Sequence, residues 1–112
     1  MKNNNLGVEV VSKILGNHTY TLYEDAGHAW IKVSIAELIA LNILVDITPF
    51  SYIKGRFAFL EEDCDMTTFF TAYQSVTDRS PRYRNSVSSR SRIRGYDSYT
   101  AELAASNFMK GL

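Results

Sequence analysis

A tight turn between two apolar runs is the feature that most constrains the fold of this chain. The dipeptide Lys54-Gly55 separates Phe50–Ile53 from Arg56–Glu61. Glycine readily adopts the positive backbone φ that a two-residue hairpin turn requires, so the pattern predicts two antiparallel strands joined at this turn. Side chains alternate between the two faces of a strand, which should place Phe57 and Phe59 on one face. An antiparallel sheet is therefore expected.

A second hairpin is predicted in the first third of the chain. Its strands are His18–Tyr23 and His28–Val33, and the residues between them include the turn formers Asp and Gly. Alternation along the second strand should place Ile31 on one face of the sheet and Trp30 on the other. The β-branched residues of Val8–Leu15 favour a further strand over a short helix.

Two helices, the first main helix and a short one near the C-terminus, are predicted from the residues at their ends. Ser34 and Glu37 have the spacing of a capping box, in which each side chain satisfies a backbone amide of the other at a helix start. Asn42 is suited to the left-handed position that ends such a helix. A last short helix is expected over residues 100–111.

The acidic run Glu61–Asp65 precedes a longer helical pattern. Apolar residues of Met66–Val76 recur every three or four positions, which predicts a second main helix capped by Asp63 or Asp65. A divalent metal site is the alternative for the acidic run. Consecutive residues point in different directions, however, and no spaced ligand set accompanies them. Capping is therefore the preferred interpretation, and no metal is expected.

Cys64 is the only cysteine, which excludes an internal disulfide and a multi-cysteine zinc site. Together with His18 or His28 its thiol could act as a nucleophile. The neighbouring acids should disfavour the thiolate, and no motif with defined mechanics is present. An enzyme is therefore not expected, and neither is a cofactor.

Together these patterns predict one α+β domain over residues 1–112. Its antiparallel sheet should have about four to six strands packed by two main helices, with a short helix near the C-terminus. Residues 1–7 are expected to be frayed. The opening residues lack the apolar core of a signal peptide, and no apolar run approaches the roughly 20 residues that span a bilayer. The protein is expected to be neither exported nor membrane-bound.

Positive charge is concentrated in residues 79–99. Six of the seven arginines lie between positions 79 and 96, without an acidic residue, although the formal net charge of the chain is zero. Guanidinium groups pair bidentately with phosphates and stack on rings, so the run predicts recognition of an anion that carries flat rings. A solvated, partly disordered tail is the alternative, but Val87 and Ile93 provide apolar anchors that a tail would not need.

The balanced total charge bears on the kind of anion. Affinity for a nucleic-acid backbone follows the number of cationic contacts, so a neutral chain favours a compact phosphate ligand or an acidic partner protein over a long nucleic acid.

Four motifs of this chain resemble the ordered landmarks of a family of short proteins common in phages and prophages. The motifs are Tyr23–Val33, Ser51-Tyr52, Leu60–Asp65 and Ser91–Tyr96, so the resemblance covers about residues 20–99. The Gly-His-x-Trp and Leu-Glu-Glu-Asp-Cys-Asp pieces are the most specific. This family is in turn similar to the first class of Thoeris anti-defence proteins, phage products of similar size that sequester cyclic nucleotide immune signals.

The resemblance implies a non-enzymatic, homo-oligomeric sponge that acts in the host cytoplasm. It would bind a cyclic nucleotide or an ADP-ribose-type signal without cleaving it, through arginines on the phosphates and aromatic rings on the base. The residues of this chain expected in those roles, chosen by their chemistry, are Trp30, Arg56, Tyr83, Arg90, Arg92, Arg94 and Tyr96. The alternative function is a small inhibitor that binds a host defence protein, of the anti-CRISPR or anti-restriction type. A nucleotide hydrolase is the least favoured hypothesis.

Overall fold

The structure of the protein is a computed structural model that describes residues 7–111. The expectation of a frayed segment over residues 1–7 falls outside the described residues apart from Gly7. In chain order the elements are α1 (Val8–Leu15), β1 (Tyr20–Asp25), β2 (His28–Ser34), α2 (Ile35–Ala40), the 3-10 turn η1 (Leu44–Asp46), β3 (Tyr52–Lys54), β4 (Phe57–Glu61), α3 (Asp65–Thr77), β5 (Tyr83–Val87), the 3-10 turn η2 (Arg92–Gly95), β6 (Asp97–Ser98) and α4 (Ala101–Lys110).

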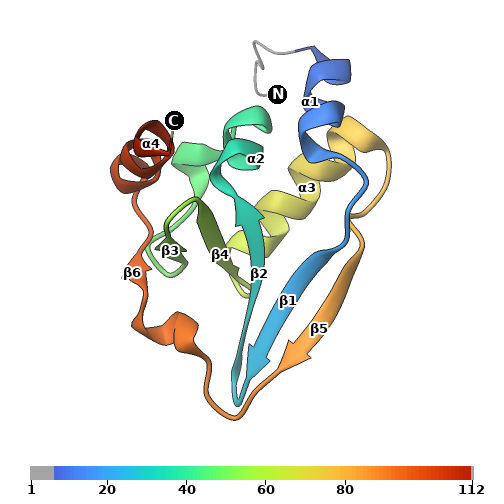
Figure 1. The fold of residues 1–112 in the computed structure, drawn as a ribbon. Helices are drawn as coiled ribbons and strands as arrows, with labels where there is room; N and C mark the ends of the chain where they lie inside the picture. The colour runs from blue at the N-terminus through green and yellow to red at the C-terminus, as the bar shows by residue number, and fades with distance from the viewer. Residues whose placement is uncertain (1–6, 112) are drawn as a thin grey trace.

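The strands form one six-stranded sheet in the order β5-β1-β2-β4-β3-β6 (Figure 1). The predicted α+β fold is confirmed, including the short C-terminal helix. Every pairing is antiparallel except that of β5 with β1, which is parallel, so the sheet is mixed rather than purely antiparallel. A parallel pair needs a long crossover between its strands, and here β2, β4 and α3 intervene. None of the described helices is long and apolar enough to cross a membrane.

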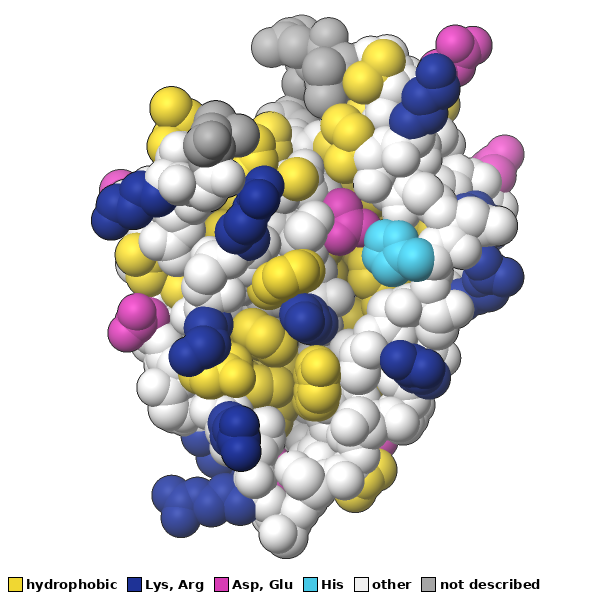
Figure 2. All heavy atoms as spheres, in the orientation of Figure 1, with side chains coloured by type: hydrophobic (Ala, Val, Ile, Leu, Met, Phe, Trp, Pro, Cys, Tyr) yellow, Lys and Arg dark blue, Asp and Glu magenta, His cyan; other side chains and the backbone are white. Residues whose placement is uncertain are grey.

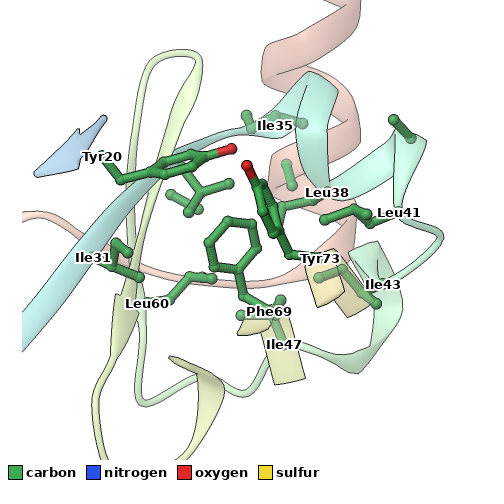
Figure 3. Packing of buried hydrophobic residues seen from close by; sticks show 14 of the residues in the cluster. Tyr20, Ile31, Ile35, Leu38, Leu41, Ile43, Ile47, Leu60, Phe69 and Tyr73 are labelled. Atoms are coloured by element: carbon green, nitrogen blue, oxygen red, sulfur yellow. The ribbon is translucent and has the colours of Figure 1, made fainter. Parts of the chain in front are cut away.

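The helices cover one face of the sheet and form the main core with it. Helix α3 runs behind the sheet in Figure 1, and α1 and α2 lie at the upper end of its strands. Figure 3 shows the apolar side chains that meet there, contributed by strands, by α2 and by α3. They include Ile31, Leu38, Leu60, Phe69 and Tyr73, each at most 2% exposed. This packing supplies most of the apolar burial that stabilises the fold.

The opposite side of the sheet carries a second, smaller cluster. Trp30, Phe59 and Ile93 are buried there, with partly buried tyrosines packed around them. Ile93 belongs to η2, so this turn folds back over part of the sheet. None of the described α-helices covers this side. We call it the open face: the side of β1, β2, β3 and β4 that bears Tyr23, Lys32, Phe57 and Phe59.

The local signals in the sequence are confirmed at both hairpins and at α2. Gly55 has φ 59°, as the tight turn between β3 and β4 requires, but Lys54 pairs with Phe57, so the turn residues are Gly55-Arg56 and not the predicted Lys54-Gly55. Ser34 and Glu37 form the predicted capping box, and Asn42 has the left-handed φ of 60° beyond the helix end. The alternation along β2 is also as predicted, because Ile31 joins the main core and Trp30 the second cluster.

The prediction of a strand over Val8–Leu15 is wrong, because this segment is the helix α1. Val11 and Leu15 lie four residues apart and are both buried, which gives the segment an apolar helical stripe. Glu9 in the first turn and Lys13 in the last turn complement the helix dipole. Packing and end charges therefore outweigh the strand propensity of the β-branched residues.

The predicted cap of α3 is also wrong. Cys64 is the N-cap residue and contributes no side-chain cap, while Asp65 is already the first helical residue. The Asp65 carboxylate, 1% exposed, turns away from its own helix and accepts hydrogen bonds from the backbone N–H of Thr48 (3.1 Å), from Thr48 Oγ1 (2.8 Å) and from Ser51 Oγ. Asp65 thus fastens the loop before β3 to the start of α3.

Candidate ligand pocket

A pocket of about 320 Å³ lies beside η2, at the end of the sheet where β2 begins and β4 ends. Its walls are His28, Trp30, Phe50, Tyr52, Glu61, Asp63, Cys64 and Arg94. These residues come from four separated stretches of the chain, which the antiparallel register of β2 with β4 and of β4 with β3 brings together. They combine cationic, acidic and aromatic side chains within one small volume.

Arg94 forms the cationic wall and is held in a fixed orientation. Its Nε donates to Asp25 Oδ2 at 2.7 Å and its Nη2 to Asp25 Oδ1 at 2.9 Å, a bidentate ion pair with a carboxylate that is only 1% exposed. Nη2 also lies 2.9 Å from His28 Nδ1. The guanidinium carbon is 5.6 Å from the ring centroid of Trp30, within cation–π range. Arg94 therefore has little conformational freedom to lose when a ligand binds.

Asp25 is the partner that orients Arg94. Its carboxylate accepts hydrogen bonds from the guanidinium and from the backbone N–H of Ser91 (3.0 Å). The Arg94 guanidinium and then the Ser91 N–H lower the pKa of Asp25 from its ordinary 3.8 to about 2, since both favour the charged form. The ion pair is therefore intact throughout the neutral and mildly acidic range.

Trp30 forms the floor of the pocket and carries an unpartnered donor. The residue is 1% exposed, and its indole Nε1 has no hydrogen-bond partner among the described residues. A buried N–H without an acceptor costs about 1–3 kcal/mol. The ring stacks on His28 at 5.8 Å and 11° and meets Tyr52 edge-on at 6.3 Å.

The acidic wall is formed by the turn between β4 and α3. Glu61 is 8% exposed, and its Oε2 accepts the backbone N–H groups of Asp63 and Cys64, each at 3.1 Å. At the start of α3 the sequence predicts a cap by Asp63 or Asp65, whereas the Glu61 carboxylate is the group that stabilises this turn. Desolvation and then the Glu61 carboxylate raise the pKa of the Cys64 thiol, which disfavours the nucleophilic thiolate. Among residues 7–111 no group of three or more His, Cys, Asp or Glu side chains is placed to hold a metal ion.

Only two of the seven predicted site residues line the pocket, namely Trp30 and Arg94. Tyr96 lies on the open face, where its ring contacts Phe59 at 5.2 Å. Arg90 and Arg92 are exposed and do not line the pocket. Arg56 and Tyr83 lie elsewhere again: the Arg56 side chain lies against Gly111 beyond α4, and the Tyr83 ring lies 6.0 Å from that of Phe70 on α3.

The arginine-rich segment contains β5, η2 and β6, but its arginines do not converge on one site. Arg82 donates to the Asn17 backbone O at 2.6 Å and to Asn17 Oδ1 at 2.8 Å, and Arg79 lies 5.6 Å from the ring centroid of Tyr73. Arg84 is on the edge strand β5. The run is thus divided between structural contacts, exposed positions and one residue of the pocket.

The sequence interpretation missed six pocket residues as ligand contacts: His28, Phe50, Tyr52, Glu61, Asp63 and Cys64. A signal for most of them was present, because His28, Tyr52, Arg94 and the acidic turn fall in the four motifs that carried the phage-family resemblance. The structure shows that these four motifs meet at a single place. Only Phe50 stands outside them.

A second hollow of about 700 Å³ lies between α3 and the turn that follows α2. Its lining contains no aromatic or cationic residue, and Asp46 is its one charged lining residue. The pocket at Arg94 is therefore the better candidate for recognition of a charged, ring-containing ligand. Comparison of the chain with protein-family models, curated proteins and solved structures found no match.

Proposed function

We propose that the protein binds and sequesters a small nucleotide in the pocket at Arg94 without cleaving it. The observation that supports the proposal is that the pocket combines a cationic group, acidic groups and aromatic rings. Arg94 and His28 form one wall, Glu61 and Asp63 form another, and aromatic rings complete the enclosure. A nucleotide has matching parts: an anionic phosphate and a flat base whose amino and ring N–H groups donate hydrogen bonds.

The phosphate would meet Arg94. A guanidinium already oriented by Asp25 presents Nη1, the nitrogen that neither Asp25 nor His28 contacts, to a phosphate oxygen at little entropic cost. His28 stands beside it as a further nitrogen donor or acceptor. Because Asp25 offsets the charge of Arg94, the attraction depends on hydrogen-bond geometry more than on net charge.

The base would meet the rings and the carboxylates. Phe50 is 68% exposed at the pocket, an unusual position for a large apolar side chain unless it covers something. Stacking of a base on such a ring contributes about 1–3 kcal/mol. Glu61 and Asp63 offer oxygen acceptors to the base amino group. A volume of about 320 Å³ is at the lower end of the usual range for ligand sites and suits one nucleotide unit.

The biological role that we propose follows from the phage-family resemblance. A phage product of this kind would act in the host cytoplasm as a homo-oligomer and hide a cyclic nucleotide or ADP-ribose-type immune signal by mass action. The raised pKa of Cys64 supports binding over catalysis, since the pocket lacks an activated thiolate. The four motifs of the resemblance all contribute to the same pocket, which supports their having one role.

The test is uptake and release of intact ligand. The purified protein is incubated with AMP, GMP, their 3′,5′-cyclic forms, cyclic dinucleotides and ADP-ribose, freed of unbound ligand, heat-denatured, and the supernatant is separated by chromatography. Recovery of at least one of these compounds unchanged is expected. An altered compound would point to a hydrolase, and no uptake of any compound would overturn the proposal in favour of a host-protein target.

Variants locate the ligand. Phe50→Ala removes an exposed ring and should weaken binding by about 1–3 kcal/mol, measured by calorimetry. Arg94→Lys keeps the positive charge beside Asp25 but loses the bidentate fork, and should also weaken binding. The matched control is Arg92→Ala, an exposed arginine two residues away that does not line the pocket. Equal losses in the Arg92 and Arg94 variants would contradict the site assignment.

A further inference from the structure

The open face of the sheet carries a connected set of aromatic rings. The Tyr23 ring lies 6.1 Å from that of Phe59, which lies 5.2 Å from that of Tyr96. Phe57 stands two residues before Phe59 on the same face of β4 and is 40% exposed. Phe59 is buried, and Tyr23 and Tyr96 are partly buried against it. Phe57 and the accessible part of Tyr96 are therefore the rings that this face offers to a ligand.

Cationic side chains are interleaved with these rings. Lys32 Nζ lies 4.1 Å from the ring centroid of Phe57, and Lys54 Nζ lies 4.9 Å from that of Tyr96. Arg84 on β5 pairs with Thr21 of β1, two residues from Tyr23, so it flanks the same face. Figure 2 shows this side of the molecule, where apolar side chains gather near the middle and dark blue Lys and Arg side chains surround them.

Acidic groups on this face are already engaged. Asp25 is paired with Arg94, and Glu61 accepts two backbone N–H groups of the turn that follows β4. The neutral net charge of the chain therefore does not describe this surface, where the cations of β2, β3 and β5 have no carboxylate as their direct strand partner. A neutral total charge therefore does not disfavour a nucleic-acid ligand at this face, because binding depends on the local field.

We propose that the open face binds single-stranded nucleic acid, with bases stacked on Phe57 and Tyr96 and the backbone phosphates on Lys32, Lys54 and Arg84. Rings that accept any base and cations that follow the backbone are the two components of sequence-tolerant single-strand sites. The four strands of the open face and the flanking β5, at about 4.8 Å spacing, together span about 19 Å, enough for a few nucleotides.

A single strand fits this face better than a duplex or an acidic protein. Stacking on exposed rings requires unpaired bases, because the bases of a duplex are stacked on one another. An acidic protein could pair with the three cations but would leave the Phe57 and Tyr96 rings without planar partners. The proposal does not depend on the nucleotide pocket, since Phe57, Lys32 and Tyr96 do not line it.

The experiment measures fluorescence anisotropy of a labelled 12-nucleotide oligo-dT and of an unstructured RNA of equal length, with the full chain, at 50 and 200 mM salt. Three phosphate contacts on a single strand predict a slope of about −2 for log K against log salt concentration, which is about twentyfold weaker binding at the higher salt. Phe57→Ala should weaken binding about fivefold or more. Lys32→Ala should weaken it and make the slope shallower.

Two control variants distinguish binding at this face from non-specific attraction to positive charge and from binding in the pocket. Lys13→Ala removes an exposed lysine of α1, which belongs to none of the strands of this face, and should leave oligonucleotide binding unchanged. Phe50→Ala removes an exposed phenylalanine of the pocket and should affect nucleotide uptake alone. A duplex bound as tightly as the single strand, no binding at 50 μM protein in 50 mM salt, or binding that survives Phe57→Ala would overturn the proposal. Circular dichroism of each variant verifies that it is folded.

Discussion

At the scale of single residues, one arginine of the cationic run has a defined structural role at the candidate site. Arg94 is paired with Asp25 and contacts His28 and Trp30. Arg90, before η2, and Arg92, its first residue, are exposed. The difference arises from η2, which is capped by Ser91 Oγ and directs Arg94 toward the sheet. Asp25 is equally important, since its carboxylate accepts the two hydrogen bonds that define the guanidinium plane.

The ion pair predicts how stability depends on pH. The folded-state pKa of Asp25, about 2, is below its ordinary 3.8, so the unfolded state binds the proton more readily. The stabilisation from this carboxylate is therefore complete above about pH 4 and is lost as the pH falls through about 2. In urea titrations from pH 6 to pH 2, the difference in unfolding free energy between the wild type and Asp25→Asn should shrink toward the acidic end. A constant difference across that range would contradict this role for Asp25.

At the scale of elements, the sequence predicts what is decided locally. The turn at Gly55 and the capping box of α2 follow from a few adjacent residues, and both are confirmed. The helix α1 was mistaken for a strand because its β-branched residues suggest one and its partners on α2 and α3 are distant in the sequence. The parallel pairing of β5 with β1 joins residues about 60 positions apart, for example Tyr20 and Tyr83, and no local pattern encodes it.

The same limit applies to the candidate pocket. Trp30 and Arg94 could be chosen by residue type, but their meeting with Tyr52 and the acidic turn depends on the register of three strands. Arg90 and Arg92 could not be distinguished from Arg94 by chemistry, because the three differ only in position: Arg90 precedes η2, and Arg92 and Arg94 lie within it. The role of the acidic run was likewise predicted wrongly. The sequence favours helix capping, whereas the carboxylates of Glu61 and Asp65 accept hydrogen bonds from adjoining turns.

Asp65 provides the prediction at this scale. Asp65→Ala removes the acceptor of three donors from the loop that carries Phe50 and leads into Tyr52, and should lower the free energy of unfolding by about 3 kcal/mol or more. Ligand uptake should fall as well, because two pocket rings lose their support. The measurement is urea denaturation together with the uptake assay. Asp63→Ala, at an exposed acidic residue of the same run, should change stability by less than about 0.5 kcal/mol.

At the scale of the whole molecule, the sheet separates two apolar clusters of unequal size. The main core joins the sheet to its helices, while the second cluster depends on Ile93 of η2 for closure. The segment from β5 through η2 is exposed along most of its length, apart from Ile93. Such a segment can open without disturbing the main core, and local openings of this kind are common where burial is limited. The pocket borders the second cluster, because Trp30 and Tyr52 belong to both.

This arrangement makes the consequences of two similar truncations differ. Leu38→Ala creates a cavity in the main core and should lower the global free energy of unfolding by about 2–5 kcal/mol. Ile93→Ala removes a side chain that is 3% exposed. It cannot lower the global free energy of unfolding by more than the free energy that holds η2 against the sheet, because a larger loss would detach this segment and leave the main core folded. Hydrogen exchange should therefore accelerate at least about tenfold in residues 88–98 of Ile93→Ala, with β2 and β4 still protected, and ligand uptake should fall as Arg94 loses its position. If β2 and β4 exchange faster by the same factor, the two clusters unfold as one unit, and the pocket cannot open independently of the core.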